Sequence, residues 1–237
     1  VAGAGKRALE GLGMGKPEVS LNPKKIMHHG QGCFPAKPVV LAQPLPVMEP
    51  LRAYLDAFHP LPDAAFDALL RRLRPVSYPR RAVITAEGEV QRSLLFIEEG
   101  IQYSYYLDAG AKQHVVAFTY PVSVSGLPES FLTQQPARYC LEALTDTRAL
   151  SLAYTELQAL FDEQPPVERL FRKLTEAMLI GLVQRQHEWL AMSAGERFRA
   201  FARRSPHLLQ RVPHKLLASY LRIDATNFSK LFNSVKI

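Results

Sequence analysis

The segment VPHKLLASYLRIDATNFSKLF, residues 212–232, carries the most specific pattern in this chain. It predicts a first helix over residues 213–221, a turn over Arg222-Ile223-Asp224, and a second helix over residues 225–233. Asp224 is suited to cap the second helix, and the small side chain of Ala218 lets the two helices cross closely. Six apolar side chains are predicted to pack between them: Leu217, Leu221, Ile223, Phe228, Leu231 and Phe232. The segment therefore predicts a helix-turn-helix.

The opposite face of the second predicted helix is polar. Thr226, Asn227 and Lys230 are short polar or cationic side chains of the type that reads base edges in a major groove. We expect a further group to meet phosphates: Ser229, His214, Lys215 and Arg222. Together these residues predict a double-stranded DNA interface.

The distribution of charge agrees with a polyanion partner for this end of the chain. The whole chain carries a net charge of +7, and residues 195–237 alone hold nine Lys or Arg against Glu196 and Asp224. Residues 48–194 are net negative. A basic segment attached to an acidic one is typical of a nucleic-acid-binding module joined to a different domain, although a solvated basic face is the alternative.

The middle of the chain has the period of short strands. Six strands are predicted, separated by turn signals at Gly88, Gly100 and Gly110, at residues 82–85, 93–97, 102–106, 113–118, 139–143 and 148–152. Regularly spaced short strands indicate an antiparallel barrel or jelly roll. Residues 51–58 and 66–73 precede it with a helical period, and Asp63 is a candidate N-cap for the second of these helices.

A long helix is predicted from Pro165 to about Met192, and Ser193-Ala194-Gly195 follows as a hinge. Its apolar positions recur every three or four residues for more than six turns, which is long enough to bind a second copy of the helix. The predicted interface residues are Phe171, Leu174, Met178 and Leu182. Packing of this stripe on its own barrel is the alternative.

Residues 1–47 are rich in Gly, Pro, Lys and Ala and show no sustained period, so we expect disorder there. We expect Met48 to be the native start, with residues 1–47 as an upstream extension. No apolar run reaches the roughly 18 residues of a membrane span, and two cysteines cannot form a disulfide framework, so a cytoplasmic location is expected.

The order of barrel, long amphipathic helix and VPHKLLASYLRIDATNFSKLF resembles the cyclic-AMP receptor protein / fumarate-nitrate regulator family of bacterial transcription factors, from about Met48 onward. The resemblance implies an α+β chain with four parts. These are an extension (1–47), a cyclic-nucleotide-binding-type β-roll sensor (48–163), a long dimerisation helix (164–194) and a helix-turn-helix DNA-binding domain (195–237). It further implies a homodimer on a two-fold-symmetric operator, with RNA polymerase as another partner.

Two departures from the family pattern affect what the chain is expected to bind. The family's phosphate-binding arginine and its Ser/Thr neighbour fall on Ala137 and Arg138, so we predict that the barrel does not bind cyclic AMP. Glu129 and Arg138 remain the candidate effector-pocket residues. In the turn, the usual glycine is replaced by Arg222, which costs about 1 kcal/mol if that residue is left-handed.

No enzymatic motif is found, and we expect no catalytic residues, no metal and no cofactor. Two function hypotheses therefore remain. The first is a transcription regulator whose barrel senses an effector or none. The second is a ligand-binding module whose helical tail contacts a protein partner instead of DNA.

Overall fold

The computed structural model describes residues 35–36, 38–40 and 48–234 of the protein. The disorder predicted for residues 1–47 falls almost wholly outside these residues. Within that segment, β1 (Val39–Val40) pairs with β2 (Arg74–Tyr78), so regular structure begins upstream of Met48.

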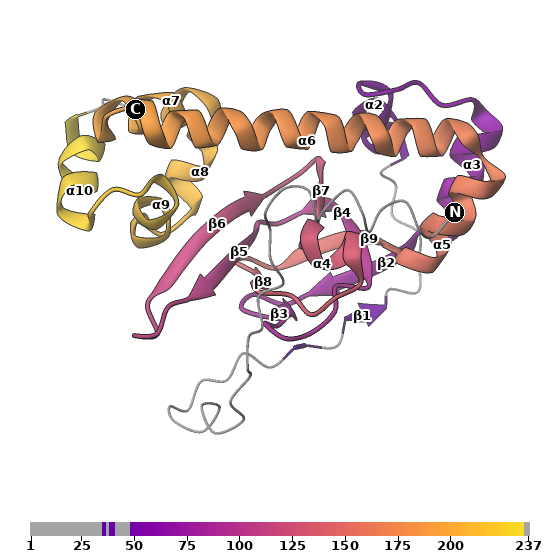
Figure 1. Ribbon diagram of the computed structural model, residues 1–237, viewed down its shortest axis with the longest axis horizontal. Coiled ribbons are helices and arrows are strands. Elements are labelled where there is room, and N and C mark those ends of the chain that lie inside the picture. The colour runs from indigo at the N-terminus through magenta and orange to yellow at the C-terminus, as the bar shows by residue number, and fades with distance from the viewer. Residues whose placement is uncertain (1–34, 37, 41–47, 235–237) are drawn as a thin grey trace, which may run out of the picture. The chain divides into compact units, whose positions relative to one another are not determined.

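Two antiparallel sheets form a β-roll, shown below the long helix in Figure 1. The first has the order β1-β2-β9-β4-β7, where β9 is Thr147–Ala153, β4 is Ser93–Glu99 and β7 is Ser123–Ser125. The second has the order β3-β8-β5-β6, where β3 is Val83–Thr85, β8 is Cys140–Ala143, β5 is Gln102–Leu107 and β6 is Gln113–Thr119. Every strand pair is antiparallel, which confirms the predicted β-roll.

Two glycines at positive φ make the predicted turns possible. Gly88 has φ +87° and Gly100 has φ +95°, values that side-chain-bearing residues rarely adopt. Gly100, between β4 and β5, is also crowded: a Cβ atom there would lie 2.3 Å from the carbonyl oxygen of Asp146. The β4–β5 turn therefore requires glycine for space as well as for backbone conformation.

The core divides between the two faces of β4, because successive side chains of a strand point in opposite directions. Leu95 and Ile97 are buried among residues of both sheets, including Tyr78 and Ala143. Phe96, between them, joins a second cluster formed with the helices that cover this sheet. These are α2 (Met48–Asp56), α3 (Asp63–Arg72), α5 (Tyr154–Glu163) and the first turns of α6 (Pro165–Ala191).

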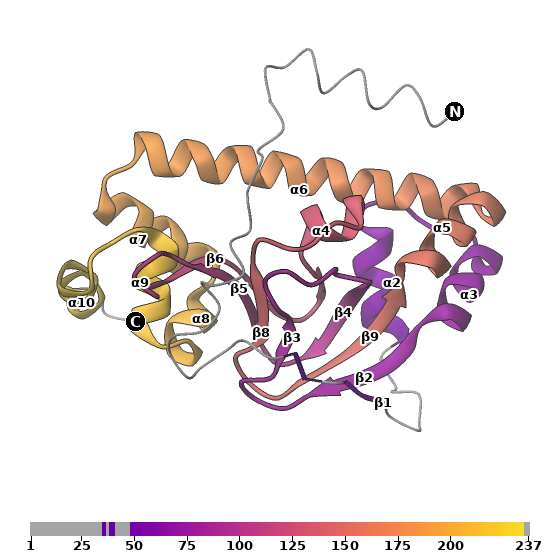
Figure 2. The same cartoon turned by 60° about the horizontal axis from the view of Figure 1, so that its bottom comes forward.

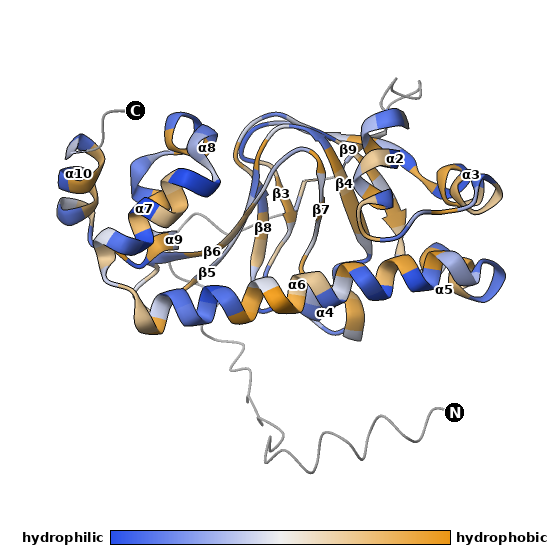
Figure 3. Ribbon diagram, turned by 90° about the horizontal axis from the view of Figure 1, so that it is seen from above, coloured by the Kyte–Doolittle hydropathy of each residue, from blue (hydrophilic) through white to orange (hydrophobic). Residues whose placement is uncertain are grey.

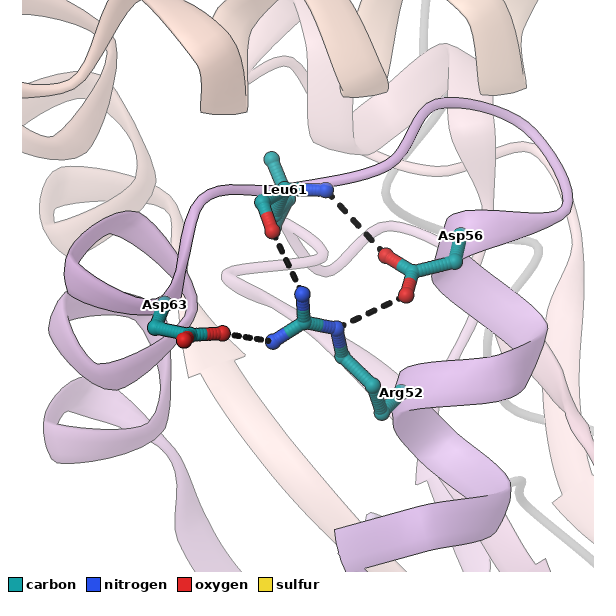
Figure 4. A network of polar contacts seen from close by, with 4 residues as sticks. All are labelled: Arg52, Asp56, Leu61 and Asp63. Atoms are coloured by element: carbon teal, nitrogen blue, oxygen red, sulfur yellow. Dashed lines mark hydrogen bonds and ion pairs between the residues drawn. The ribbon is translucent and has the colours of Figure 1, made fainter.

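Figure 4 shows the polar network that joins α2 to α3. Arg52 donates to Asp56 at 2.8 Å, to the carbonyl oxygen of Leu61 at 2.5 Å and to Asp63 at 3.1 Å. The prediction that Asp63 caps α3 is wrong: the N-cap is Pro62, without a side-chain hydrogen bond. The carboxylate of Asp63 instead binds the guanidinium of the preceding helix.

The helix α6 runs along the β-roll from α5 to the C-terminal helices (Figure 2). Its bounds match the predicted 165–192 within one residue. In its first turns Val167, Leu170 and Phe171 are buried in the chain's own core, whereas residues 177–184 are all exposed. Figure 3 shows hydrophobic colour along this exposed middle part of α6.

Four helices follow: α7 (Ala194–Arg204), α8 (Pro206–Arg211), α9 (His214–Leu221) and α10 (Ala225–Ser234). The predicted hinge contains a capping box, in which Ser193 and Glu196 bond reciprocally at the start of α7. Among residues 48–234, no helix combines the length and apolar character that a membrane span requires.

Helix α9 packs on the β6 edge of the roll. The backbone N–H of Val115 donates to the hydroxyl of Ser219 at 3.0 Å. Arg185 of α6 donates to the carbonyl oxygen of Val116 at 2.7 Å, and its guanidinium carbon lies 4.9 Å from the ring centre of Tyr220. The long helix, the sheet edge and α9 therefore share one contact region.

Candidate functional site

The turn between α9 and α10 spans the predicted residues, Arg222-Ile223-Asp224. Arg222 is left-handed, with φ 54° and ψ 46°, at the end of α9. The carboxylate of Asp224 accepts from the backbone N–H of Asn227 at 2.8 Å and caps the start of α10. The predicted Asp224 cap is confirmed, and Arg222 adopts the left-handed conformation whose cost the sequence left conditional.

The inward face of α10 is the predicted apolar one. Phe228 is 1% exposed and lies in one buried cluster with Leu217, Leu221 and Ile223. Leu231 and Phe232 pack against this cluster, and the ring of Phe228 meets that of Phe198 in α7 edge-on at 5.4 Å. This packing fixes the outward face of α10.

That outward face carries the residues predicted to read bases. Thr226 and Lys230 are exposed, and Asn227 is half-buried. Ser229, predicted to meet phosphates, is exposed and donates its hydroxyl proton to the carbonyl oxygen of Ala225 at 3.0 Å. Its hydroxyl proton is thus already engaged within the helix.

The other predicted phosphate contacts differ in how freely they can reach a ligand. Lys215 is exposed at the start of α9. His214 is exposed as well, but its ring packs 4.2 Å from that of Phe232. The guanidinium of Arg222 lies 4.0 Å from the ring centre of Trp189 in α6, so part of its role is structural.

Two more basic residues of the segment 195–237 are structural, which sequence reasoning missed. Arg197 donates to the carbonyl oxygens of Leu221, Met192 and Arg222 at 2.9, 2.6 and 3.1 Å. Arg204 binds Glu188 of α6 at 2.8 Å. Not all of the local positive charge is therefore free to meet an anion.

The two candidate effector-pocket residues lie together but bind each other. Arg138 donates to Glu129 of α4 (Pro128–Thr133) at 2.7 Å, and its side chain is 71% exposed. This hydrogen bond raises the pKa of Arg138. Ala137, at the position of the family's arginine, is buried, and its backbone N–H donates to the carbonyl oxygen of Glu89. The pair forms a surface bridge, and the arginine position holds a buried methyl group.

The four predicted interface residues of α6 fall into two groups. Phe171 is 8% exposed, meets Phe161 edge-on at 5.7 Å, and lies with Leu174 against the chain's own core. Met178 and Leu182 are 38% and 52% exposed. Further exposed apolar side chains surround these two: Leu179, Ile180 and Val183.

The β-roll is similar to a known domain family. Residues 75–164 match the cyclic nucleotide-binding domain family. Among curated proteins, no sequence matches this chain.

Solved structures extend the likeness beyond that domain. FixK2 from Bradyrhizobium japonicum is 20% identical with a TM-score of 0.58, over 68% of this chain and 83% of its own. CLP from Xanthomonas campestris, a c-di-GMP-responsive global regulator, is 14% identical with a TM-score of 0.55, over 73% and 90%. A cyclic nucleotide-binding domain from Methylobacillus flagellatus is 16% identical with a TM-score of 0.53, over 60% and 82%. At these identities the likeness is one of fold, and the chain has the cyclic nucleotide-binding fold.

Proposed function

We propose that this protein is a transcription regulator that binds double-stranded DNA as a homodimer, with α9 and α10 as its helix-turn-helix. The observation that carries the proposal is the α9–turn–α10 geometry. A left-handed Arg222 and a capping Asp224 set the angle of α10, Phe228 fixes its inward face, and Thr226 and Lys230 face outward. A second helix with a short polar outer face is what a major groove admits.

Charge supports the same partner. Beyond the arginines used in structural contacts, exposed cations on α7, α9 and α10 include Arg199, Arg203, Lys215 and Lys230. Phosphate neutralisation by such residues is the main sequence-independent source of DNA affinity. In this proposal residues 48–163 form the sensor, 164–194 the dimerisation helix and 195–237 the DNA-binding part of a cytoplasmic protein, with RNA polymerase as a further partner.

The exposed middle of α6 supports the homodimer. Met178, Leu182 and their exposed neighbours Leu179, Ile180 and Val183 form a continuous apolar stretch on one helix. A second copy of α6 would remove this surface from water, since helices with apolar residues at such spacing pair with one another.

The sensor is proposed not to bind cyclic AMP. Arg138, already paired with Glu129, and the buried Ala137 leave the cyclic phosphate without a positioned counter-charge. Calorimetry with cyclic AMP and cyclic GMP tests this, and micromolar binding of either nucleotide would contradict it.

The deciding experiment is selection of bound DNA from a random pool at physiological salt, followed by two substitutions. We expect Asn227→Ala to relax base preference at one position by roughly 1–3 kcal/mol and to leave the salt slope unchanged. We expect Lys215→Ala to weaken binding to all sequences alike and to lower the salt slope by about one unit for each half-site. If the protein selects no DNA, the hypothesis of a protein-contacting helical tail replaces this one.

A further inference from the structure

A cleft of about 520 Å³ lies between the β-roll and the C-terminal helices. Its walls come from the β2–β3 turn, the β8–β9 turn, the last turn of α8 and the segment that joins α8 to α9. Its charged or titratable lining consists of Arg80, Asp146, Arg211 and His214. The apolar lining residues are Leu144, Leu209, Val212 and Pro213. Segments far apart in sequence thus bring two guanidinium groups to one cleft.

Both guanidinium groups are available to a ligand. Arg80 and Arg211 are exposed, and neither side chain has an ion pair or hydrogen bond with the residues that the structure describes. The carboxylate of Asp146 is the opposing charge, and one of its oxygens accepts from the backbone N–H of Arg80 at 2.7 Å. The formal charge of the lining is positive even with His214 neutral, so the cleft favours an anion.

The cleft adjoins the face proposed for DNA. His214 lines it and also packs on Phe232 of α10, and the exposed Lys215 is the next residue of α9. No Phe, Tyr or Trp is among the lining residues, and the His214 ring already packs on Phe232, so the cleft offers no platform on which a nucleotide base could stack. These features fit the phosphates of a continuous backbone better than a free nucleotide.

We infer that this cleft binds DNA backbone phosphates beside the operator half-site, so that Arg80 of the sensor β-roll contacts the same duplex as α10. The inference rests on the proposed function and extends its interface from the C-terminal helices to the β-roll. Arg80 and Arg211 position the duplex without reading its sequence, because phosphates carry no base identity.

The test compares two duplexes that share the selected operator. The short duplex ends at the last base pair that the selection defines, and the long duplex adds flanking base pairs of arbitrary sequence on both sides. The variant is Arg80→Gln/Arg211→Gln, and the matched control is Arg71→Gln on α3, an exposed arginine outside the cleft lining.

We expect the wild-type protein to bind the long duplex more tightly than the short one, with a steeper salt slope. The double variant should lose this difference, and its slope on the long duplex should fall by about two units for each half-site. Its affinity for the short duplex should remain that of the wild-type protein. Ethylation of flanking phosphates should weaken binding of the wild-type protein but not of the double variant.

Three outcomes would overturn the inference. In the first, the wild-type protein binds both duplexes equally, which leaves the proposed function intact. In the second, the double variant and Arg71→Gln behave alike on the long duplex. In the third, the wild-type protein binds neither duplex, and then the proposed function fails as well.

Discussion

Arg222 is held in a left-handed conformation and at the same time over an aromatic ring. The conformation costs a residue with a Cβ atom roughly 1–2 kcal/mol. The contact of its guanidinium with the ring of Trp189, at 4.0 Å, stabilises the folded chain by about 0.5–1 kcal/mol. The two effects oppose each other when the side chain is removed.

We therefore expect Arg222→Gly to change the free energy of unfolding by less than about 1 kcal/mol in the wild-type chain. In a Trp189→Leu background, where the ring contact is absent, the same substitution should stabilise by about 1 kcal/mol. Denaturant unfolding of the four proteins in this cycle measures both values. Equal effects in the two backgrounds would mean that the ring contact contributes nothing to stability.

Glu142 of β8 predicts a pH dependence. Burial raises the pKa of its carboxyl, against hydrogen bonds from the hydroxyls of Tyr105 and Tyr103 that lower it. The folded chain keeps this proton to higher pH than the unfolded chain does. The contribution of Glu142 to stability therefore falls as pH rises from the pKa of the unfolded chain through the higher pKa of the folded chain. Glu142→Gln should thus be more favourable, relative to wild type, at pH 7 than at pH 4. Unfolding by urea at the two pH values checks this, and a pH-independent difference would contradict it.

At the scale of elements, the β4–β5 turn allows a test that separates backbone strain from steric crowding. Gly88 and Gly100 share a positive φ, but only Gly100 faces a backbone carbonyl at 2.3 Å from the position of a Cβ atom. Gly88→Ala should cost about 1–2 kcal/mol of unfolding free energy for backbone strain alone. Gly100→Ala should cost about 1–3 kcal/mol more, since β4 or the β8–β9 turn must move. Equal losses by thermal or urea unfolding would show that the turn relaxes freely.

Elements with a strong local period were predictable from sequence, and those set by partners were not. The six predicted strands and α6 are all present, because alternation, glycine turns and proline starts are local signals. β2 was missed, since Pro75 interrupts it and its pairing with β9 is what makes it a strand. β7 was missed because Ser123-Val124-Ser125 holds a single apolar residue, which is too few to show an alternation.

The candidate site shows the same division. The Asp224 cap follows from neighbouring residues, and sequence alone predicts it. The three bonds of Arg197 reach carbonyl groups up to 25 residues away, so they depend on how α7 packs. The burial of Phe171 in the chain's own core likewise depends on α5, which the pattern of α6 does not contain.

At the scale of the whole molecule, the proposed homodimer depends on the exposed part of α6. Leu182→Glu should give a monomer, because the glutamate is solvated in the free chain but would be an unpaired charge inside an interface. Sedimentation equilibrium measures the mass. The matched control is Leu132→Glu on α4, a leucine 58% exposed, which should remain dimeric. A dimeric Leu182→Glu protein would place the interface elsewhere.

Arg185 gives the long helix a direct mechanical connection to two other parts of the molecule. One guanidinium binds the carbonyl oxygen of Val116 on β6 and packs on the ring of Tyr220 on α9. Because the two contacts share a side chain, their free energies are not additive. A displacement of α6 along its axis strains both contacts in the same movement. Any change in the position of α6 at Arg185 would therefore alter its contacts with the sheet edge and with α9 together.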